Sequence, residues 1–305
     1  MDIAQAIASS IKMQKASEET KTFERVEVVA PGYINFYLSP DYFQNTIAST
    51  LQENFPQFQE SVKNEKVMVE YSQPNTHKEF HIGHLRNVFI GSTIVNVLRK
   101  AGDKVVSANY IGDTGTHIAK CLWGLVTFHA DENLDSISNK AEFLGSVYSE
   151  ATQKIEENPE YEDAFKEIQK KFDAGDKELV ALWKKTRDWS MDEFQNIYTE
   201  LGVSFDEYFF ESIEEEAGKK ILPELLQEGV VEKSEGAVID NLEQYNLGVL
   251  VLVRKDGGVL YGLKDIPLAK KKFEEFGIDR SIYVVDVRQS LYLKQLFKIL
   301  ELCGF

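Results

Sequence analysis

The sequence predicts an α/β protein whose main domain is built on a parallel β-sheet, with a helical insertion inside that domain and a small α+β domain before it. Two observations carry this prediction. A strand-like run at 67–71, a helical pattern at 84–100 and a second strand-like run at 105–110 follow one another. That order makes a parallel sheet with a right-handed crossover the default. The range from about 116 to 228 is almost wholly helical in pattern, before strand-like runs return.

The N-terminal domain is predicted to span 1–62 and to hold one hairpin between two helices. Apolar residues at helical spacing predict a helix within 1–22. Strand-like runs at 26–29 and 33–38 flank a Pro-Gly pair, which is typical of a turn. A helical pattern then starts near Pro40, and the polar stretch after it marks the boundary.

The main domain is predicted to span 63–305, with the insertion at about 116–228. After the insertion, apolar runs of strand length alternate with helical patterns. The strand-like runs are 237–239, 249–253, 259–261 and 282–287, and the helical patterns are 266–276 and 289–302. We therefore expect two halves of one sheet separated by the insertion, with the active crevice where the halves meet.

Composition leaves the partner question open. The net charge of −16 argues against a general nucleic-acid binder, since such proteins neutralise phosphates with clustered Lys and Arg, although a local basic face remains compatible with it. No run of about eighteen apolar residues predicts a membrane span. The N-terminus lacks the basic start of a secretory signal, and the two isolated cysteines, Cys121 and Cys303, fit a reducing cytoplasm better than a disulfide.

The sharpest local signal is the segment 75–85, between the first strand of the main domain and the helix after it. Helix N-termini favour phosphate groups through free backbone N–H groups and the helix dipole. Three imidazoles and one lysine lie within eight residues there, and they add donors that can follow charge on a phosphate: His77, Lys78, His81 and His84. Gly83 lacks a Cβ and would let a base or ribose approach the backbone.

Histidines at a helix start have two plainer roles, as caps or as metal ligands. His81 and His84 have the i, i+3 spacing that suits either role. No cysteine lies nearby and no further ligands are well spaced, so a zinc site is not predicted. The strand-loop-helix context favours nucleotide binding.

The segment also resembles a known family. His81-Ile82-Gly83-His84 after the first strand of a βαβ unit is similar to the signature of class I aminoacyl-tRNA synthetases, and the wider set of words resembles arginyl-tRNA synthetases in particular. The resemblance covers most of the chain from about Glu24 onward. The words that carry it are 69–75, Lys78, 81–86, 109–113, 201–206, 211–212, 234–237, 256–261, Asp265 and 284–289.

The resemblance implies a Rossmann-like catalytic domain that binds ATP, activates L-arginine to arginyl-adenylate and transfers the arginyl group to tRNA(Arg). On this resemblance Lys78, His81 and His84 are the expected catalytic residues, and the same three with Gly83 are expected to hold ATP. A cation near the transferring phosphate would stabilise its developing charge. Mg²⁺ is expected to accompany ATP through phosphates and water, so no protein metal ligand is predicted.

The resemblance also implies an arginine pocket, and its residue types suit a guanidinium. A planar group with five donors is best met by carboxylates and by a flat or hydroxyl partner. Amides are expected to hold the α-amino and carboxylate ends of the substrate. Taken singly, Asp265 could be a helix N-cap and Tyr261 a core aromatic. The predicted arginine-binding residues are Glu70, Gln73, Asn75, Tyr261, Asp265 and Gln289.

Charged runs elsewhere have a plainer interpretation. The basic runs at 184–187, 219–220 and 270–272 could line an RNA path, but such runs are more often solvated helix faces. The acidic stretch 211–216 is likewise expected to be an exposed helix face rather than a metal site.

The chain departs from the family pattern in several places. A complete enzyme is expected to carry a lysine-bearing loop after the last strand, followed by an anticodon-binding helical domain, and the chain stops at Phe305 before either. The N-terminal domain resembles only the latter half of the family's, so we expect a chain truncated at both ends. Thr114 stands where an aromatic residue is usual. We expect a monomer. Two alternative functions remain: a non-catalytic arginine- or nucleotide-binding protein, and a nucleotidyltransferase for another small molecule.

Overall fold

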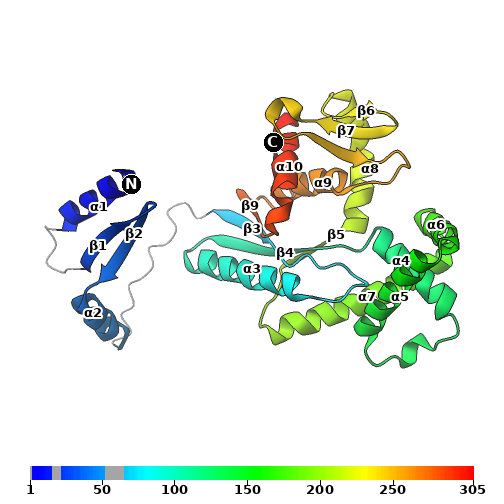
Figure 1. The fold of residues 1–305 in the computed structure, drawn as a ribbon, viewed down its shortest axis with the longest axis horizontal. Coiled ribbons are helices and arrows are strands. Elements are labelled where there is room, and N and C mark those ends of the chain that lie inside the picture. The colour runs from blue at the N-terminus through cyan, green and yellow to red at the C-terminus, as the bar shows by residue number, and fades with distance from the viewer. Residues whose placement is uncertain (1, 16–21, 52–64) are drawn as a thin grey trace. The chain divides into compact units, whose positions relative to one another are not determined.

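The computed structural model describes residues 2–15, 22–51 and 65–305. The chain divides into two units, Met1–Gln59 and Glu60–Phe305, and each is described here by itself (Figure 1). In the described ranges, no helix combines the length and the apolar character needed to cross a membrane. Cys121 and Cys303 are both free thiols.

The N-terminal unit holds a β-hairpin and two helices: α1 (Asp2–Lys15), β1 (Phe23–Val29), β2 (Tyr33–Leu38) and α2 (Pro40–Leu51). The antiparallel register pairs Val26 with Phe36, and Phe23 packs its ring 5.0 Å from that of Phe36. The hairpin turns at the cis peptide between Ala30 and Pro31. The polar segment expected after the first helix, and the boundary segment before residue 65, lie largely outside the described residues.

The second unit is built on a four-stranded parallel sheet with the order β5-β4-β3-β9. The strands are β3 (Lys66–Glu70), β4 (Lys104–Ile111), β5 (Glu207–Phe210) and β9 (Arg280–Tyr283). Helix α3 (Ile82–Lys100) is the crossover between β3 and β4. An α/β fold on a parallel sheet, as the sequence predicts, is therefore confirmed.

Strand β3 is central and apolar side chains leave both of its faces. Val67 and Val69 pack with Val95 of α3 on one face, and Met68 packs with Leu268 on the other. Successive strand residues point to opposite faces, so a strand covered on both sides reads as a continuous apolar run. That continuity is why 67–71 was recognisable as a buried strand.

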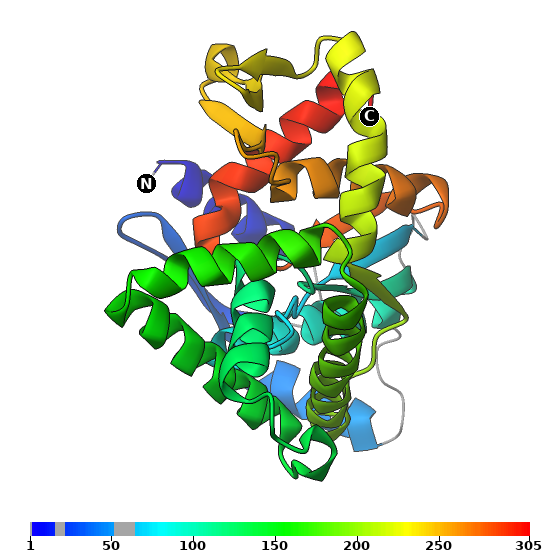
Figure 2. The ribbon, with the colours of Figure 1, turned by 90° about the vertical axis from the view of Figure 1, so that its right-hand side faces the viewer.

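The range from 116 to 228 forms five α-helices, a short 3₁₀ turn and one strand. Figure 2 shows α4 to α7 packed as a helical group, joined through the cluster around Leu122, Leu144 and Trp183. The elements are α4 (Thr116–Phe128), η1 (Leu134–Ser136), α5 (Lys140–Glu157), α6 (Glu160–Asp173), α7 (Lys177–Glu200), β5 and α8 (Glu211–Gln227). The nearly all-helical prediction holds except at β5, which it missed because a four-residue strand is too short to show a period of two.

The strands after α8 form a sheet of their own. β6 (Glu232–Ser234), β7 (Ala237–Asn241) and β8 (Val249–Val253) are antiparallel, so the expectation that they belong to the second half of one parallel sheet is wrong. Val259 makes only an isolated bridge to Val253. The short Gly-containing connections between these runs suit hairpins rather than crossovers.

This antiparallel sheet packs against three helices through one apolar cluster. The helices are α8, α9 (Tyr261–Glu274) and α10 (Ser290–Leu302), with η2 (Glu243–Tyr245) and η3 (Val287–Gln289) as 3₁₀ turns. Leu225, Leu242, Leu252, Leu263 and Leu296 meet in the cluster. Helix α9 therefore joins the two sheets, because Leu263 faces the antiparallel one and Leu268 faces the parallel one.

Candidate functional site

A cavity of about 480 Å³ opens beside the carboxyl end of β3. In an open parallel sheet this is the edge where ligands bind. The six residues that the resemblance implies for arginine all line it: Glu70, Gln73, Asn75, Tyr261, Asp265 and Gln289. They come from β3 and its loop, from the start of α9 and from η3, so the fold brings together residues up to 219 positions apart (289 − 70).

The loop after β3 has an unusual backbone. Ser72, Gln73 and His77 have positive φ values of 74°, 53° and 61° although none is glycine. A non-glycine residue in this region costs ~1–3 kcal/mol, and it persists only where its surroundings hold it. Such strain is typical of ligand sites, and here it falls on the segment that supplies Gln73 to the cavity.

Helix α7 and strand β4 hold this loop in place. The hydroxyl of Ser72 lies 2.7 Å from that of Tyr198, and the amide of Asn109 donates to the same Tyr198 hydroxyl at 3.0 Å. The Asn109 side-chain oxygen accepts from the backbone N–H of Gln73 at 3.1 Å. Tyr198 and Asn109 are fully buried. The helical insertion thus holds the loop that supplies Gln73 to the cavity, a role that sequence reasoning missed because nothing local to Tyr198 points to it.

Asn75 lies against a glycine on the neighbouring strand end. It forms a parallel bridge with Gly112, and a Cβ on Gly112 would lie 2.2 Å from the Asn75 side-chain oxygen. No real Cβ makes such a contact, so a side chain at position 112 would displace Asn75 from the cavity wall.

Asp265 places an unpaired carboxylate oxygen in the cavity wall. Tyr292 donates its hydroxyl to Oδ2, while Oδ1 is buried with no hydrogen-bond partner. Burial raises the pKa of Asp265 to about 7, with Glu70 adding to the rise against the opposing effects of Tyr292 and Lys272. The buried hydroxyl of Tyr110, also in the wall, lacks a partner as well. Buried polar atoms are normally paired, so this wall is shaped for a ligand with donors.

Glu70 is held by two neighbours beneath the same cavity. Lys272 contacts its Oε2 at 2.5 Å, and the side-chain amide of Gln73 donates to its Oε1 at 2.7 Å. Burial alone would lower the pKa of Lys272, but Glu70 and Tyr283 outweigh it and leave that pKa raised. Each Glu70 oxygen therefore has one buried partner and keeps a lone pair for a ligand.

The interpretation of the basic run 270–272 as a solvated face is wrong at Lys272, whose side chain is 0% exposed. Helical periodicity turns one member of three consecutive residues inward, and composition does not say which. The other basic runs hold paired residues: Lys185 contacts Asp135 at 2.6 Å and Lys219 contacts Glu216 at 2.8 Å. Arg187 lies 3.5 Å from the buried Asp113.

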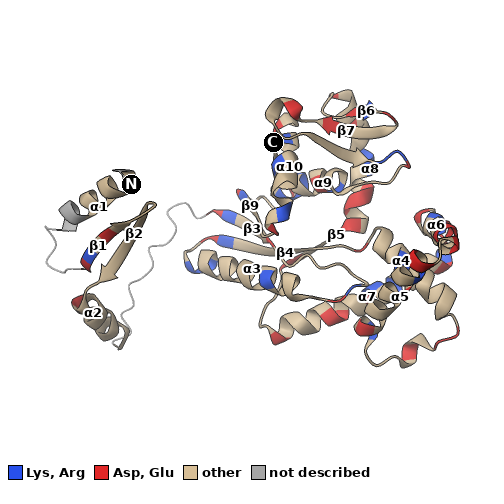
Figure 3. Cartoon of the chain, viewed as in Figure 1, with Lys and Arg blue, Asp and Glu red and all other residues tan. Residues whose placement is uncertain are grey.

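The acidic stretch 211–216 is also not simply an exposed face, although acidic residues do gather at the start of α8 (Figure 3). Glu211 lines the cavity, and burial raises its pKa. Lys264 compensates it by contacting Glu211 at 3.4 Å and Glu215 at 3.0 Å, and Glu214 is buried beside Lys271 at 3.3 Å. Glu211 and Glu214, three positions apart on α8, thus face inward to partners that a local pattern does not reveal.

The four residues expected to hold the nucleotide lie at and before the start of α3, and none of them lines the cavity. His81 is the N-cap of α3 and accepts from the N–H of Gly83 at 3.1 Å. His84 in turn accepts from the N–H of His81 at 3.3 Å, and the two rings stack at 3.8 Å. The capping role weighed for these histidines is therefore present. Lys78 lies with its ammonium 4.9 Å from the Tyr148 ring centre.

Of the two stacked rings, that of His84 is uncharged near neutral pH. Burial lowers the pKa of His84 to about 4, with His81 and Lys78 adding to the effect. A Cβ on Gly83 would lie 2.9 Å from the His81 ring, so the glycine makes room for that ring. His81 is exposed, and it lies at a helix N-terminus where phosphate is favoured.

His77 does not belong to this group of donors. It is fully buried, with Nδ1 3.0 Å from the Thr76 hydroxyl and Nε2 2.7 Å from the Thr186 hydroxyl. Burial lowers its pKa to about 3, so the ring stays neutral and ties the loop to α7. The expectation that three imidazoles follow phosphate charge is wrong for His77, because its ring is buried and both ring nitrogens lie against hydroxyl groups.

In the described part of the chain, no group of three or more His, Cys, Asp or Glu side chains is arranged to hold a metal ion. The cavity instead combines carboxylates with aromatic hydroxyls and amides. Carboxylates suit a cationic group of a ligand, and amides and hydroxyls suit its other polar groups.

Known proteins resemble this chain in both sequence and fold. The family model for the catalytic domain of class I tRNA synthetases (R) matches residues 46–305. The arginine–tRNA ligase of Bdellovibrio bacteriovorus is 39% identical over 285 residues, which are 91% of this chain and 49% of that ligase. The chain spans about half the length of the curated relatives it matches.

Two solved structures share the fold. The arginyl-tRNA synthetase of Thermus thermophilus gives a TM-score of 0.58 at 27% identity, with 89% of this chain and 45% of that chain covered. The arginyl-tRNA synthetase of Plasmodium falciparum gives a TM-score of 0.65 over 97% of this chain and 52% of that chain, and at 21% identity it speaks to the fold alone.

Proposed function

The chain belongs to the class I tRNA synthetases of the arginine type, and on that premise we propose that it forms the part of an arginine–tRNA ligase that binds ATP and L-arginine. The whole reaction would activate L-arginine with ATP and then transfer the arginyl group to tRNA(Arg). The observation that carries the proposal is the unpaired Oδ1 of Asp265 in a cavity lined by all six expected arginine residues.

The guanidinium is proposed to lie against Asp265 and Glu70. It would donate to the free Asp265 Oδ1 and to the lone pairs that Glu70 keeps beside Lys272 and Gln73. Hydrogen bonds from a charged donor to a carboxylate are about twice as strong as neutral ones. Tyr261, which is 57% exposed at the start of α9, would cover the side chain of the substrate.

The amino-acid end is proposed to lie toward Asn75 and Gln289. Both are amides, and each offers a carbonyl oxygen to the α-amino group and an NH₂ to the carboxylate. Asn75 is fixed by its bridge to Gly112. The substrate carboxylate would then point to the strand ends, the direction in which the α-phosphate of ATP must lie for attack.

ATP is proposed to bind at the start of α3. Backbone N–H groups at the N-terminus, the exposed His81 and Lys78 would meet the phosphates, and the neutral His84 ring could donate one hydrogen bond. As the substrate carboxylate attacks the α-phosphorus and pyrophosphate leaves, these donors stabilise the charge that spreads over the phosphate oxygens. Mg²⁺ would accompany the nucleotide through its phosphates and water.

The test is binding of a non-hydrolysable sulfamoyl analogue of arginyl-adenylate, compared with the lysyl analogue and with L-arginine alone. The analogue should occupy both proposed subsites at once. It should therefore bind at least ~100-fold more tightly than L-arginine, as analogues of reaction intermediates generally do. The lysyl analogue should bind at least ~10-fold more weakly than the arginyl one. Equal affinity for both analogues would contradict the arginine pocket, and an arginyl analogue no tighter than L-arginine would contradict the adjacent nucleotide site.

A further inference from the structure

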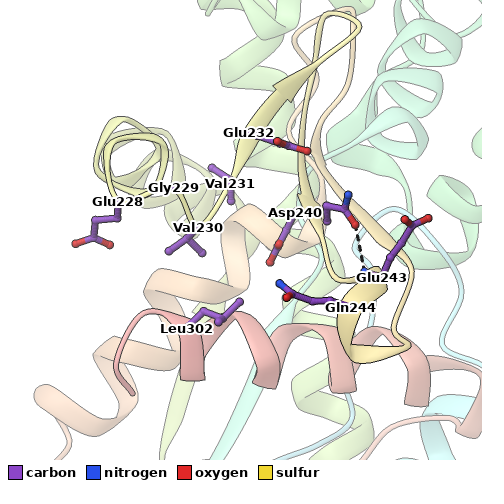
Figure 4. A pocket seen from close by; sticks show the side chains of 10 residues that line it. Glu228, Gly229, Val230, Val231, Glu232, Asp240, Glu243, Gln244 and Leu302 are labelled. Atoms are coloured by element: carbon purple, nitrogen blue, oxygen red, sulfur yellow. Dashed lines mark hydrogen bonds between the residues drawn. The ribbon is translucent and has the colours of Figure 1, made fainter.

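A second cavity, of about 600 Å³, lies in the subdomain built on the antiparallel sheet (Figure 4). It is lined by the end of α8, strands β6 and β7, the turn η2 and the last turn of α10. We call it the acid pocket. Its lining residues are Glu228, Gly229, Val230, Val231, Glu232, Asp240, Asn241, Glu243, Gln244 and Leu302, and none of them lines the arginine cavity.

The acid pocket has an apolar side and an acidic rim. Val230, Val231 and Leu302 supply the apolar side, and Figure 4 shows Val230 and Leu302 facing the same space. Four carboxylate side chains, but no lysine or arginine, are among the described residues that line it. A charge pattern of this kind attracts cations and repels anions, while the apolar side favours aliphatic groups.

One of the four acids is buried and points into the space. Asp240 is 3% exposed, and its Oδ2 has no hydrogen-bond partner. Figure 4 shows its carboxylate directed from β7 toward Leu302 and Gln244. A carboxylate removed from water without a partner is costly, so the position calls for a donor. Burial, and then Glu232, raises the pKa of Asp240 to about 6, so the group is still ionised at pH 7 and above.

We propose that the acid pocket binds a primary alkylammonium group, whose ammonium donates to Asp240 and whose methylene chain lies on Val230 and Leu302. A long aliphatic amine keeps its stem on apolar surface while its charged end meets a carboxylate. Such a group is carried by free polyamines and by lysine side chains. Glu228, Glu232 and Glu243 raise the local concentration of either one.

Two other cations fit this pocket less well. A divalent metal ion needs at least six oxygen ligands for Mg²⁺ or Ca²⁺, and no group of three acidic or metal-binding side chains is so arranged in the described parts of the chain. A guanidinium carries five N–H donors, whereas Asp240 is the one buried acid among the described residues that line the pocket. An ammonium carries three donors and therefore needs fewer buried acceptors.

The test is titration of the protein with butylammonium chloride at pH 7.5 and constant ionic strength, followed by backbone amide NMR. Chemical shifts should change around Val230, Asp240 and Leu302. Asp240→Asn should weaken binding at least ~10-fold, since it removes the paired charge. Shift changes confined to the arginine cavity, or an Asp240→Asn variant that binds as tightly as the parent protein, would overturn the proposal.

Two matched variants separate a local effect from general electrostatics. Glu200→Gln removes one exposed negative charge at the end of α7 and should leave affinity within twofold. Asp265→Asn removes a carboxylate from the other cavity, beside β3, and should also leave the affinity for butylammonium within twofold, whether or not the chain is a ligase. Leu302→Ser should weaken binding several-fold through the apolar side, which gives a second route to the same site. A loss as large in Glu200→Gln as in Asp240→Asn would overturn the proposal.

The source of the ammonium is separated by comparing spermidine with a blocked lysine, N-acetyl-lysine methylamide. If a polyamine is the ligand, spermidine binds more tightly because its further ammonium groups meet the acidic rim. If a protein side chain is the ligand, the blocked lysine binds at least as well, because its backbone amides reach the polar groups of Asn241 and Gln244.

Discussion

Protonation of Asp265 should control the affinity for L-arginine. Its pKa in the free protein is about 7, and the guanidinium would bind only the ionised carboxylate. At pH 6 such a group is ~10% ionised and at pH 8 ~90%, so the dissociation constant should fall ~10-fold between the two, or ~1.4 kcal/mol. Below pH 7 each binding event should release close to one proton.

Calorimetry measures both effects. L-Arginine is titrated at pH 6, 7 and 8 in two buffers with different enthalpies of ionisation, and the dependence of the observed enthalpy on buffer gives the number of protons released. In Asp265→Asn the loss of a charged hydrogen bond should weaken binding by ~1.5–3 kcal/mol and remove the pH dependence. Titration of the ligand's own amino group would persist in the variant, which makes the variant the control.

The reasoning is refuted if the protein binds L-arginine equally well at pH 6 and pH 8 without releasing protons. It is also refuted if Asp265→Asn retains the same pH dependence, because another group would then titrate. The same raised pKa has a consequence for folding. Because Asp265 ionises less readily in the folded protein than in the unfolded chain, the protein should lose stability as pH rises from about 4 to about 7. Arginine should therefore stabilise the protein most above pH 7.

Three further predictions concern buried charge. Lys272→Met should lower the free energy of unfolding by ~3–5 kcal/mol because it leaves the buried Glu70 without its cationic partner. The control Lys294→Met, at an exposed position, should change it by less than ~0.5 kcal/mol, and equal values from urea denaturation would contradict this. His77 is neutral in the folded protein, with a pKa of about 3, so stability should be lost as pH falls through 6.5 toward 3, by ~2 kcal/mol at pH 5. His77→Gln should flatten this dependence of stability on pH, and an unchanged dependence would show that His77 does not cause it. Asp240→Asn should raise stability at pH 8 by ~1 kcal/mol and leave it unchanged at pH 4, as followed by thermal unfolding, and a lower stability at pH 8 would mean that the carboxylate has a partner.

The elements around the first crossover were predictable from sequence because their patterns are long and regular. The strand at 67–71, the helix at 84–100 and the strand at 105–110 correspond to β3, α3 and β4 within two residues at every end. Val67 and Val69 cover one face of the strand and Met68 the other, so the strand was recognisable without an alternation of polar and apolar residues. Helices of 19 residues, such as α3, show their period clearly.

Features that depend on distant partners were not predictable. β5 is a strand because β4 offers it an edge, and its four residues have no period of their own. β6, β7 and β8 pair with one another rather than with the parallel sheet, a choice that the strand-like pattern of each does not encode. Local sequence indicates that a strand exists, while its neighbour is decided by packing.

The cavity shows the same division. The family resemblance implied Glu70 and Asp265, and both line the one cavity. It did not reveal Lys272, which local composition groups with two other lysines, or the left-handed backbone of Gln73. Tyr198 lies 126 residues from the Ser72 that it holds, so no spacing rule connects them. Burial and strain of this kind become visible only in three dimensions.

The most direct test of the central claim is a crystal structure of the chain with L-arginine at pH 8. Since binding there needs no proton release from Asp265, occupancy should be high at millimolar ligand. The account predicts a guanidinium nitrogen within ~3 Å of Asp265 Oδ1, with the amino-acid end between Asn75 and Gln289. A guanidinium bound away from Asp265, or an amino-acid end at the Asp265 side of the cavity, would contradict it.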